Sequence, residues 1–453
     1  MQEELLQLLN KFDVPTPRYT SYPTVPFWEP DTINPSRWLE SVKNMFVEEN
    51  GELSIYIHLP YCENLCTFCA CNKRITKNHN VEARYIEAVL KEWKMYKAHF
   101  PSQPIIREIH LGGGTPTFFS PENLTKLIKG ITADCNISDS HEFSVEVHPN
   151  YTKAEHLVAL SRLGFNRISL GVQDFDPEVQ FIINRMQSFE KTKEVVDWSR
   201  KYGLHSINID LVYGLPKQTQ RSVEMTVEFI KELQPDRIAF YSYAHVPWKS
   251  KGQRRYAEAA LPSAQEKWQM YHRGRGLLMM QGFVPIGMDH FALPDDKLFK
   301  AAAEGKMHRN FMGYTTTNNK LIVGLGCSSI SDSWTAFVQN EKEVEAYEEK
   351  IENGNWTFIT GHALNKEDLI LRKNILELMC NGKTTIENAL DQNFLNVAFD
   401  KLKQLAGDGL LELENNTITV TDKGQLFIRN ISAALDARWW RKSNTEKTFS
   451  KAI

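Results

Sequence analysis

From residue 53 onward, short apolar runs alternate with longer amphipathic stretches. The apolar runs are rich in β-branched residues, which favours strands, and they cover residues 54–58, 106–111, 142–147, 167–171, 206–211 and 237–243. The stretches between them have helical spacing and lie near residues 81–99, 121–133, 152–163, 175–201, 219–233 and 262–281. Six alternations predict a parallel sheet with helices outside it. An open barrel and a flat doubly wound sheet both fit this rhythm.

Segments on either side of this β/α region have different patterns. Residues 1–12 predict a short amphipathic helix, and four prolines exclude regular structure through 15–30, although that stretch is too apolar for a free linker. An acidic, glycine-interrupted boundary lies at 340–365. Residues 366–453 then predict helix, turn, helix, hairpin and helix, an order typical of a winged-helix-like domain. The predicted domains are 1–30, 31–340 and 366–453.

Each predicted strand ends in residues that differ from its interior. The first strand leads into a cysteine-rich loop, and the others lead to Gly112-Gly113-Gly114-Thr115, Glu146, Gln173, Asp210 and residues 243–245. Because the carboxyl ends of parallel strands meet at one rim, these groups are predicted to line one site. The alternative is that the glycines form a bare turn and the carboxylates cap neighbouring helices.

Four of the seven cysteines, Cys62, Cys66, Cys69 and Cys71, lie within ten residues. Thiolates this close form disulfides or bind a metal. Structural zinc sites usually take two ligand pairs, whereas here three thiols share one loop and no second Cys-x-x-Cys pair occurs. Three thiolates on four irons leave one iron open to a small molecule, which favours a [4Fe–4S] cluster. A zinc site completed by Cys71 or His58 is the alternative, and disulfides are less favoured than either.

Composition and charge narrow the classes of function. A hydrophobic fraction of 42% and a charged fraction of 24% are ordinary for a globular protein. The net charge of −3 gives no reason to expect nucleic acid or an anionic membrane as partner. Residues 366–453 carry 13 Lys and Arg against 12 Asp and Glu, which argues against a DNA-binding domain. No apolar run could span a bilayer and the N-terminus lacks a signal-peptide pattern, so we expect a cytoplasmic protein.

The spacing Cys-x3-Cys-x2-Cys is the signature of the radical S-adenosylmethionine (SAM) enzymes. With Cys71, and with the motifs at residues 17–24, 56–58, 112–116, 287–291 and 308–316, the chain resembles the oxygen-independent coproporphyrinogen III oxidases along most of its length. The haem chaperone-like relatives carry Phe at the position of Cys71, lack oxidase activity and are the second interpretation. A zinc-stabilised nucleic-acid module is a distant third.

The resemblance implies a fold, a reaction and cofactors. The fold is an α/β fold, an open, partial β/α barrel of about six units with a mainly helical, winged-helix-like C-terminal domain. The reaction converts two propionates of coproporphyrinogen III to vinyls, giving protoporphyrinogen IX, through a 5′-deoxyadenosyl radical. The cofactors are a [4Fe–4S] cluster and two SAM molecules, so no catalytic side chain is expected. We expect a monomer with an unidentified electron donor and acceptor and no nucleic-acid or membrane partner.

The family's ligand positions carry over to matching residues. The cluster is assigned to Cys62, Cys66 and Cys69. The first SAM is assigned to Tyr56, Gly113, Glu146 and Ile330, where Ile330 lies near the end of a further predicted strand at 321–331. The second SAM is assigned to Phe68, Gly114, Thr115, Gln173, Arg185, Asp210 and Ala244. Candidates for the substrate propionates are Arg18, Lys73, Arg74 and Arg309, and residues 1–30 are expected to fold over the mouth of the site.

Overall fold

A 12-stranded sheet forms the centre of the computed structural model, which describes residues 2–387, 389–441 and 449–450. Its strand order is β16-β15-β14-β13-β1-β4-β5-β6-β7-β8-β10-β9. Neighbouring strands in the middle of the sheet are all parallel. These are β13 (Ile322–Leu325), β1 (Glu52–Leu59), β4 (Ile105–Gly113), β5 (Asn136–Val147), β6 (Arg167–Gln173), β7 (Ser206–Tyr213) and β8 (Arg237–Ser242).

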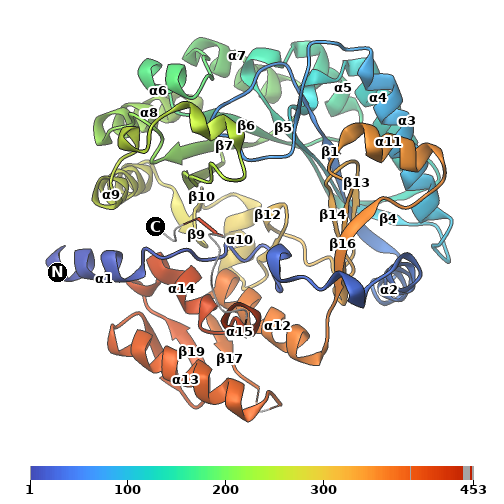
Figure 1. Ribbon diagram of the computed structural model, residues 1–453. Coiled ribbons are helices and arrows are strands. Elements are labelled where there is room, and N and C mark those ends of the chain that lie inside the picture. The colour runs from blue at the N-terminus through green and yellow to red at the C-terminus, as the bar shows by residue number, and fades with distance from the viewer. Residues whose placement is uncertain (1, 388, 442–448, 451–453) are drawn as a thin grey trace.

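Antiparallel strands extend both edges of the parallel region. On one side lie β14 (Ile330–Asp332), β15 (Ala336–Asn340) and β16 (Phe358–Ala363), and on the other β10 (His290–Ala292) and β9 (Val284–Ile286). The two edge strands, β16 and β9, are not paired with each other, so the curved sheet is an open barrel (Figure 1). This confirms the barrel and excludes the flat doubly wound alternative.

Helices cover the convex face of the sheet (Figure 1). They are α3 (Val81–Lys97), α4 (Pro121–Thr132), α5 (Ala154–Arg162), α6 (Pro177–Ile182), α7 (Phe189–Lys201), α8 (Gln220–Leu233) and α9 (Ala264–Met280). Along β1, Leu53, Ile55 and Ile57 are completely buried in the main hydrophobic core, and Tyr56 and His58 lie on the opposite face. Within the described ranges, no helix combines the length and apolar character needed to cross a bilayer.

The predicted helix at 175–201 is wrong in one respect, because it is two helices. The chain leaves α6 at Ile182, Asn184 adopts a left-handed conformation with φ of 53°, and Ser188 starts α7 by accepting a hydrogen bond from the Lys191 N–H. An N-cap serine inside a stretch of helical periodicity is the signal for this break. The break places Arg185 in a loop, where its side chain can reach the rim of the barrel.

The predicted strand at 321–331 is also divided. β13 ends at Leu325, and Gly326 and Ser328 have φ values of 92° and 59° in a tight turn. β14 then starts at Ile330 and runs antiparallel to β13. Ile330 therefore begins the next strand rather than ending the predicted one, because the positive φ angles reverse the chain.

The remaining elements complete the barrel edge and the terminal regions. Around the barrel lie α2 (Pro35–Glu48), β2 (Tyr61–Cys62), β3 (Arg74–Ile75), α10 (Lys297–Ala303), β11 (His308–Asn310), β12 (Gly313–Thr315) and α11 (Val344–Glu352). The C-terminal region comprises α12 (Lys366–Asn381), β17 (Lys383–Thr385), α13 (Gln392–Gly407), β18 (Leu411–Glu414), β19 (Thr417–Val420), α14 (Ile428–Ala433) and α15 (Ala437–Arg441). Its sheet order is β17-β19-β18, so the predicted hairpin is present and pairs with a third short strand.

The N-terminal segment shares a hydrophobic core with the C-terminal region. Leu8 and Leu9 from α1 (Gln2–Phe12), with Tyr19 and Tyr22, belong to the same buried cluster as Leu371 and many other C-terminal side chains. Figure 1 shows the N-terminal chain running between the barrel and the C-terminal helices. The segment at 15–30 has no α-helix and only an isolated bridge at Pro15, and it contains a 3-10 turn at Val25–Phe27 and the start of a second at Pro30–Thr32.

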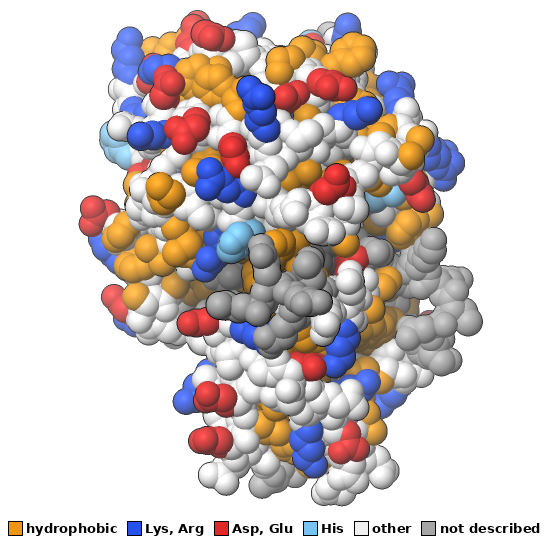
Figure 2. All heavy atoms as spheres, turned by 90° about the vertical axis from the view of Figure 1, so that its left-hand side faces the viewer, with side chains coloured by type: hydrophobic (Ala, Val, Ile, Leu, Met, Phe, Trp, Pro, Cys, Tyr) orange, Lys and Arg blue, Asp and Glu red, His pale blue; other side chains and the backbone are white. Residues whose placement is uncertain are grey.

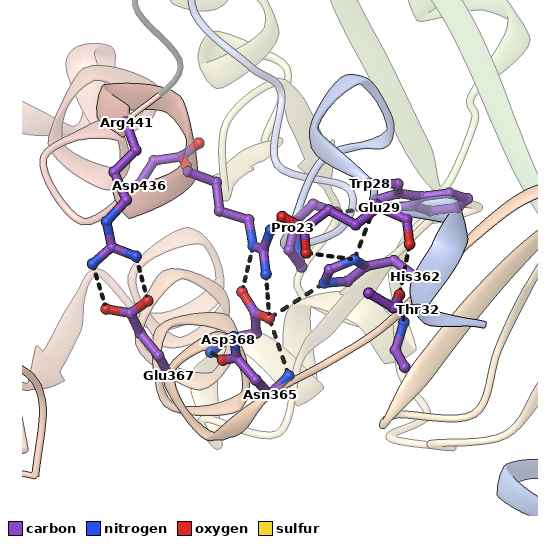
Figure 3. A network of polar contacts seen from close by, with 12 residues as sticks. Pro23, Trp28, Glu29, Thr32, His362, Asn365, Glu367, Asp368, Asp436 and Arg441 are labelled. Carbon is purple, nitrogen blue, oxygen red and sulfur yellow. Dashed lines mark hydrogen bonds and ion pairs between the residues drawn. The ribbon is translucent and has the colours of Figure 1, made fainter. Parts of the chain in front are cut away.

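A buried network joins the N-terminal segment to the barrel edge and the C-terminal helices (Figure 3). The Glu29 N–H donates to His362 Nδ1 at 3.2 Å, so Nε2 carries the proton of the neutral ring and donates to Asp368 at 3.2 Å. Arg438 donates to both oxygens of Asp368, at 2.6 and 2.8 Å, and pairs with Glu29 at 2.8 Å. Asp368 therefore receives hydrogen bonds from two separate parts of the chain.

We expect Asp368→Asn to lower the free energy of unfolding by about 3 kcal/mol, because it leaves the Arg438 guanidinium without its buried carboxylate. Burial alone would raise the pKa of Asp368, but hydrogen bonds from His362 and Arg438 lower it to about 2. Because the pKa is lower in the folded than in the unfolded chain, this contribution is complete above about pH 4 and is lost as the pH falls toward 2.

Urea unfolding at several pH values measures this difference. The control is Glu367→Gln, which breaks the more exposed pair with Arg441 one residue away and is expected to cost less than about 1 kcal/mol. Equal destabilisation by the two substitutions would contradict the role given to Asp368.

Candidate active site at the carboxyl ends of the strands

A cavity of about 480 Å³ lies where the parallel strands end. Cys62, Cys66 and Cys69 line it from one side. The predicted strand-end and loop residues that also line it are Phe68, Gly113, Gly114, Thr115, Glu146, Gln173, Arg185 and Asp210. The structure therefore brings together side chains that are up to about 150 positions apart, as the strand-end pattern predicts.

Tyr56, Ala244 and Ile330, also predicted to bind SAM, are not among the residues that line this cavity. Tyr56 stacks on His110 and its hydroxyl lies 3.0 Å from His58 Nδ1. The Ala244 carbonyl accepts a hydrogen bond from Gln253 at 3.2 Å. Their assignment to SAM stays a prediction.

The cysteine loop is attached to the barrel on two sides. On the side of the α6–α7 link, the Thr67 N–H donates to the Ile183 carbonyl at 2.9 Å, and the Asn184 side chain donates to the Leu65 carbonyl at 2.8 Å. On the side of β8, Gln253 donates to the Phe68 carbonyl at 2.7 Å. These bonds fix the backbone between the cysteines, which a short loop could not fix by itself.

The glycine triplet packs directly against the cysteine loop. A Cβ on Gly114 would lie 2.6 Å from the backbone of Pro60, and one on Gly113, whose φ is 113°, would lie 2.8 Å from the His58 ring. The Gly114 N–H donates to Leu59, and the Thr115 hydroxyl lies 3.3 Å from Cys62 Sγ. The triplet is therefore more than a bare turn, because it allows the second strand to approach the metal-binding loop closely.

The donor set fits an iron–sulfur cluster. All three thiols are free and partly buried, and they face one cavity from a single loop. Arg185 Nη1 lies 3.5 Å from Cys66 Sγ, and Lys73 lines the same cavity, so positive charge is available to stabilise thiolates. Among the described residues, no three His, Cys, Asp or Glu side chains are placed to hold a single metal ion. Thiolates on one loop beside an open cavity are the ligand arrangement that such clusters use.

The pKa values of Glu146 and Asp210 shift in opposite directions. Burial would raise the pKa of Glu146. Hydrogen bonds from His110 and from the Gly113 N–H, together with the electrostatic effect of His110 and His58, lower that pKa overall. Burial, and then the charge of Glu146, raise the pKa of Asp210 to about 6. Neither carboxylate caps a helix, because Glu146 contacts His110 and Asp210 accepts hydrogen bonds from Ser169 and Asn208. An ionised Glu146 at the cavity wall can bind an ammonium group.

Arg185 reaches the rim from the break between α6 and α7. Its Nη2 donates to the Gly171 carbonyl, while its buried Nε has no hydrogen-bond partner among the described residues. Cys71, whose role the sequence left open, also lines the cavity, and sequence reasoning missed several other lining residues: Asn64, Pro116, Val147, His148, Asn150, Tyr151, Ser169, Gly171, Asn184, Met186, Val212 and Tyr241. The sequence His148-Pro149-Asn150, directly after the third strand, could have indicated some of them.

The four predicted propionate-binding cations lie in different surroundings. Arg74 is exposed and pairs with Glu345 at 2.6 Å. The Lys73 ammonium donates to the carbonyls of Cys69 and Cys71. Arg18 donates to the Ser242 carbonyl at the end of β8, and Arg309 is buried over the Tyr314 ring and donates to the Arg18 carbonyl. Arg18 and Arg309 are thus neighbours on the side of β8.

The chain is similar to known proteins over nearly its whole length. Residues 56–230 match the radical SAM superfamily. The oxygen-independent coproporphyrinogen III oxidase of Pseudomonas aeruginosa is 38% identical over 98% of both chains, and that of Escherichia coli is 37% identical over 99% of this chain and 98% of its own. The chain belongs to the oxygen-independent coproporphyrinogen III oxidase family. Among solved structures, coproporphyrinogen III oxidase (HemN) from Escherichia coli, described as a radical SAM enzyme, matches with a TM-score of 0.89 and 36% identity, covering 95% of this chain and 98% of that one.

Membership of the oxygen-independent coproporphyrinogen III oxidase family confirms the predicted class of enzyme. The protein is a radical SAM oxidoreductase, and the family implies a [4Fe–4S] cluster and SAM as cofactors. These relatives do not favour the haem chaperone-like interpretation, and the radical SAM match contradicts the zinc-stabilised nucleic-acid module.

We expect Cys62→Ala to abolish assembly of the iron–sulfur cluster and Cys71→Ala to retain it. The first substitution removes one of three thiolate ligands, whereas Cys71 lies outside the Cys-x3-Cys-x2-Cys set. Iron and sulfide analysis after anaerobic reconstitution, with the visible absorption spectrum, checks both variants. Equal loss of iron from the two proteins would make Cys71 a ligand.

Proposed function

We propose that the protein decarboxylates two propionate side chains of coproporphyrinogen III to vinyl groups without oxygen and so forms protoporphyrinogen IX. Close similarity over nearly the whole chain to oxidases of this name is the observation that carries the proposal. The three-thiol cavity at the strand ends supports it independently, because it is suited to the cofactors that such chemistry requires.

The cofactors would occupy the cavity at the strand ends. Cys62, Cys66 and Cys69 would hold the cluster, and Tyr56, Gly113, Glu146 and Ile330 the first SAM. When bound, the cluster and SAM supply a 5′-deoxyadenosyl radical that removes hydrogen from an unactivated carbon. An ionised Glu146 suits the ammonium of the methionyl part. The protein's own task is then to orient these groups and to keep water away from them.

A second SAM is proposed beside the first. Its residues would be Phe68, Gly114, Thr115, Gln173, Arg185, Asp210 and Ala244. Two features of the site support this: the buried Arg185 Nε has no described partner, and Asp210 on β7 lines the same cavity as Glu146 on β5. A guanidinium of this kind suits a carboxylate, and a carboxyl group suits ribose hydroxyls.

Arg18 and Arg309 would bind substrate carboxylates. Arg309 is only 7% exposed, forms no ion pair with a carboxylate of the described chain, and its Nε has no hydrogen-bond partner there. Tyr241, which lines the cofactor cavity, is close enough for the Arg309 charge to affect its pKa. The Arg309 charge helps to lower the pKa of nearby Asp289, but no described ion pair neutralises it, so its remaining hydrogen-bonding capacity beside the cavity favours an anionic substrate. Arg74 is the weakest candidate because Glu345 already neutralises it.

The other partners and the setting are part of the proposal. We infer a cytoplasmic monomer with an electron donor and an electron acceptor, because thiols and a cluster near the surface persist best in a reducing compartment. The face seen in Figure 2 shows acidic and basic side chains interspersed over its lower part, which supports a C-terminal domain that packs and covers rather than one that binds nucleic acid.

The decisive experiment is anaerobic reconstitution followed by incubation with coproporphyrinogen III, SAM and a reductant. We expect 5′-deoxyadenosine, methionine and a tetrapyrrole that has lost two carboxyl groups, all measurable by liquid chromatography and mass spectrometry. The radical supplied by SAM initiates each decarboxylation, so omission of SAM should prevent both. Haem binding without 5′-deoxyadenosine would instead favour the haem chaperone-like function.

We expect Arg309→Gln to raise the KM for coproporphyrinogen III by about tenfold or more, because a charged hydrogen bond is worth about 1.5–3 kcal/mol. Cleavage of SAM in the absence of substrate should stay at the wild-type rate. The matched control is Arg74→Gln, which removes an exposed guanidinium and should leave KM unchanged. Partial recovery in Arg309→Lys, with an unchanged thermal midpoint, would separate a binding role from a structural one. An unchanged KM in Arg309→Gln would remove this residue from the substrate site.

A further inference from the structure

A basic segment, residues 249–255, packs against the outer side of the cysteine loop. It follows β8 and contains Lys249, Lys251, Arg254 and Arg255, all exposed. Between residues 243 and 262 the only acidic residue is Glu258, so four cations stand against one anion. The usual role of such a run is a solvated surface, and neither the cofactor cavity nor the substrate site accounts for it.

Three residues hold this segment against the cysteine loop. Gln253 is completely buried and donates to the Phe68 carbonyl at 2.7 Å. The Ser250 hydroxyl donates to the Cys69 carbonyl at 2.9 Å. A Cβ on Gly252 would lie 3.1 Å from the Thr67 carbonyl, so the two backbones are nearly in contact. The polar and small residues of the segment therefore point inward, and its cations point to solvent.

One further exposed cation, Lys342, lies beside this segment, between Glu341 and Glu343 in the sequence. The Lys342 carbonyl accepts a hydrogen bond from Asn72, which follows the cysteine loop, and the Lys342 side chain is exposed. Burial and the charge of Lys342 together lower the pKa of Lys249, which shows that these two ammonium groups lie near each other. Among the described ion pairs, Lys251, Arg254, Arg255 and Lys342 join none. Half-exposed Trp248, at 42%, adds an aromatic side chain at the edge of the surface.

We propose that residues 249–255, with Lys342, form the docking surface for an acidic, low-potential, one-electron carrier protein that reduces the enzyme's iron–sulfur cluster. The step is a one-electron transfer. One electron leaves the reduced carrier and one enters the cluster, and no bond is made or broken. The inference rests on the cluster site proposed above.

Charge and position both support this partner. A surface of one sign attracts an oppositely charged protein and speeds its encounter. Electron-transfer complexes are small and transient, so a few exposed cations around one aromatic residue are sufficient contact. The carrier would rest on the segment that directly covers residues 67–69, which include the third cluster thiol. An electron then needs to cross only the cysteine loop itself.

The test compares two double variants of the full-length, reconstituted protein. Lys251→Ala/Arg255→Ala removes two exposed cations of the segment and keeps Ser250 and Gln253. Arg221→Ala/Lys231→Ala removes two exposed cations from α8 on the outside of the barrel. The probe is an acidic plant-type [2Fe–2S] ferredoxin, a low-potential one-electron carrier. Its dissociation constant is measured by calorimetry in the oxidised state, so that binding is observed without turnover.

At low salt we expect the dissociation constant to rise roughly tenfold for Lys251→Ala/Arg255→Ala and to stay unchanged for the α8 variant. The difference should shrink as salt rises, since the screening length falls from about 30 Å at 0.01 M to about 3 Å at 1 M. Turnover driven by ferredoxin should fall in parallel, whereas turnover driven by dithionite should equal that of the wild type.

Equal dissociation constants for the two variants would overturn the docking surface. Loss of dithionite-driven turnover in Lys251→Ala/Arg255→Ala would also overturn it, because the defect would then lie in the cysteine loop and not in docking. If the wild type itself fails to turn over coproporphyrinogen III with dithionite, the proposed function fails, and the ferredoxin titration still decides the docking question on its own.

Discussion

The structure of the candidate active site depends on how the cysteine loop is attached to the barrel. The cluster thiols lie on a stretch of eight residues that has no helix or strand long enough to hold its own shape. Its backbone is instead tied to the α6–α7 link by Thr67 and Asn184 and to the chain after β8 by Gln253, and just before Cys62 the Tyr61 carbonyl accepts a hydrogen bond from the Thr115 N–H after β4. Each tie comes from a different part of the barrel, so the loop has its geometry only when the whole sheet is formed.

That dependence explains where the barrel tolerates unusual residues. Gly113 and Gly114 stand where a side chain would collide with His58 or Pro60, and the break between α6 and α7 supplies the Ile183 carbonyl and the Asn184 side chain. A continuous helix at 175–201 would be more regular, but it would leave the Thr67 N–H without this partner. The local irregularities are therefore consistent with one requirement, the support of the thiol loop.

The two ends of the chain pack together in a shared hydrophobic core. Tyr19 and Tyr22 pack among C-terminal side chains, and Asp368 receives hydrogen bonds from both His362 and Arg438. Arg18 is carried on the same N-terminal segment and reaches the end of β8. Placement of Arg18 beside Arg309 thus depends on the fold of the C-terminal region. A mainly structural domain in this way positions the two arginines that we propose as ligands of the substrate carboxylates.

By itself, the sequence determined the β/α order, the strand-end positions of Glu146 and Asp210, and the three thiols, because periodicity and ligand spacing are local properties. It did not determine the division of 175–201 or of 321–331, since positive φ angles at Asn184, Gly326 and Ser328 have no periodic signature. It also could not separate Arg309 from Arg74. One guanidinium is buried outside any described ion pair and the other is paired with Glu345 at the surface, and only tertiary packing decides which side chains share a low-dielectric interior.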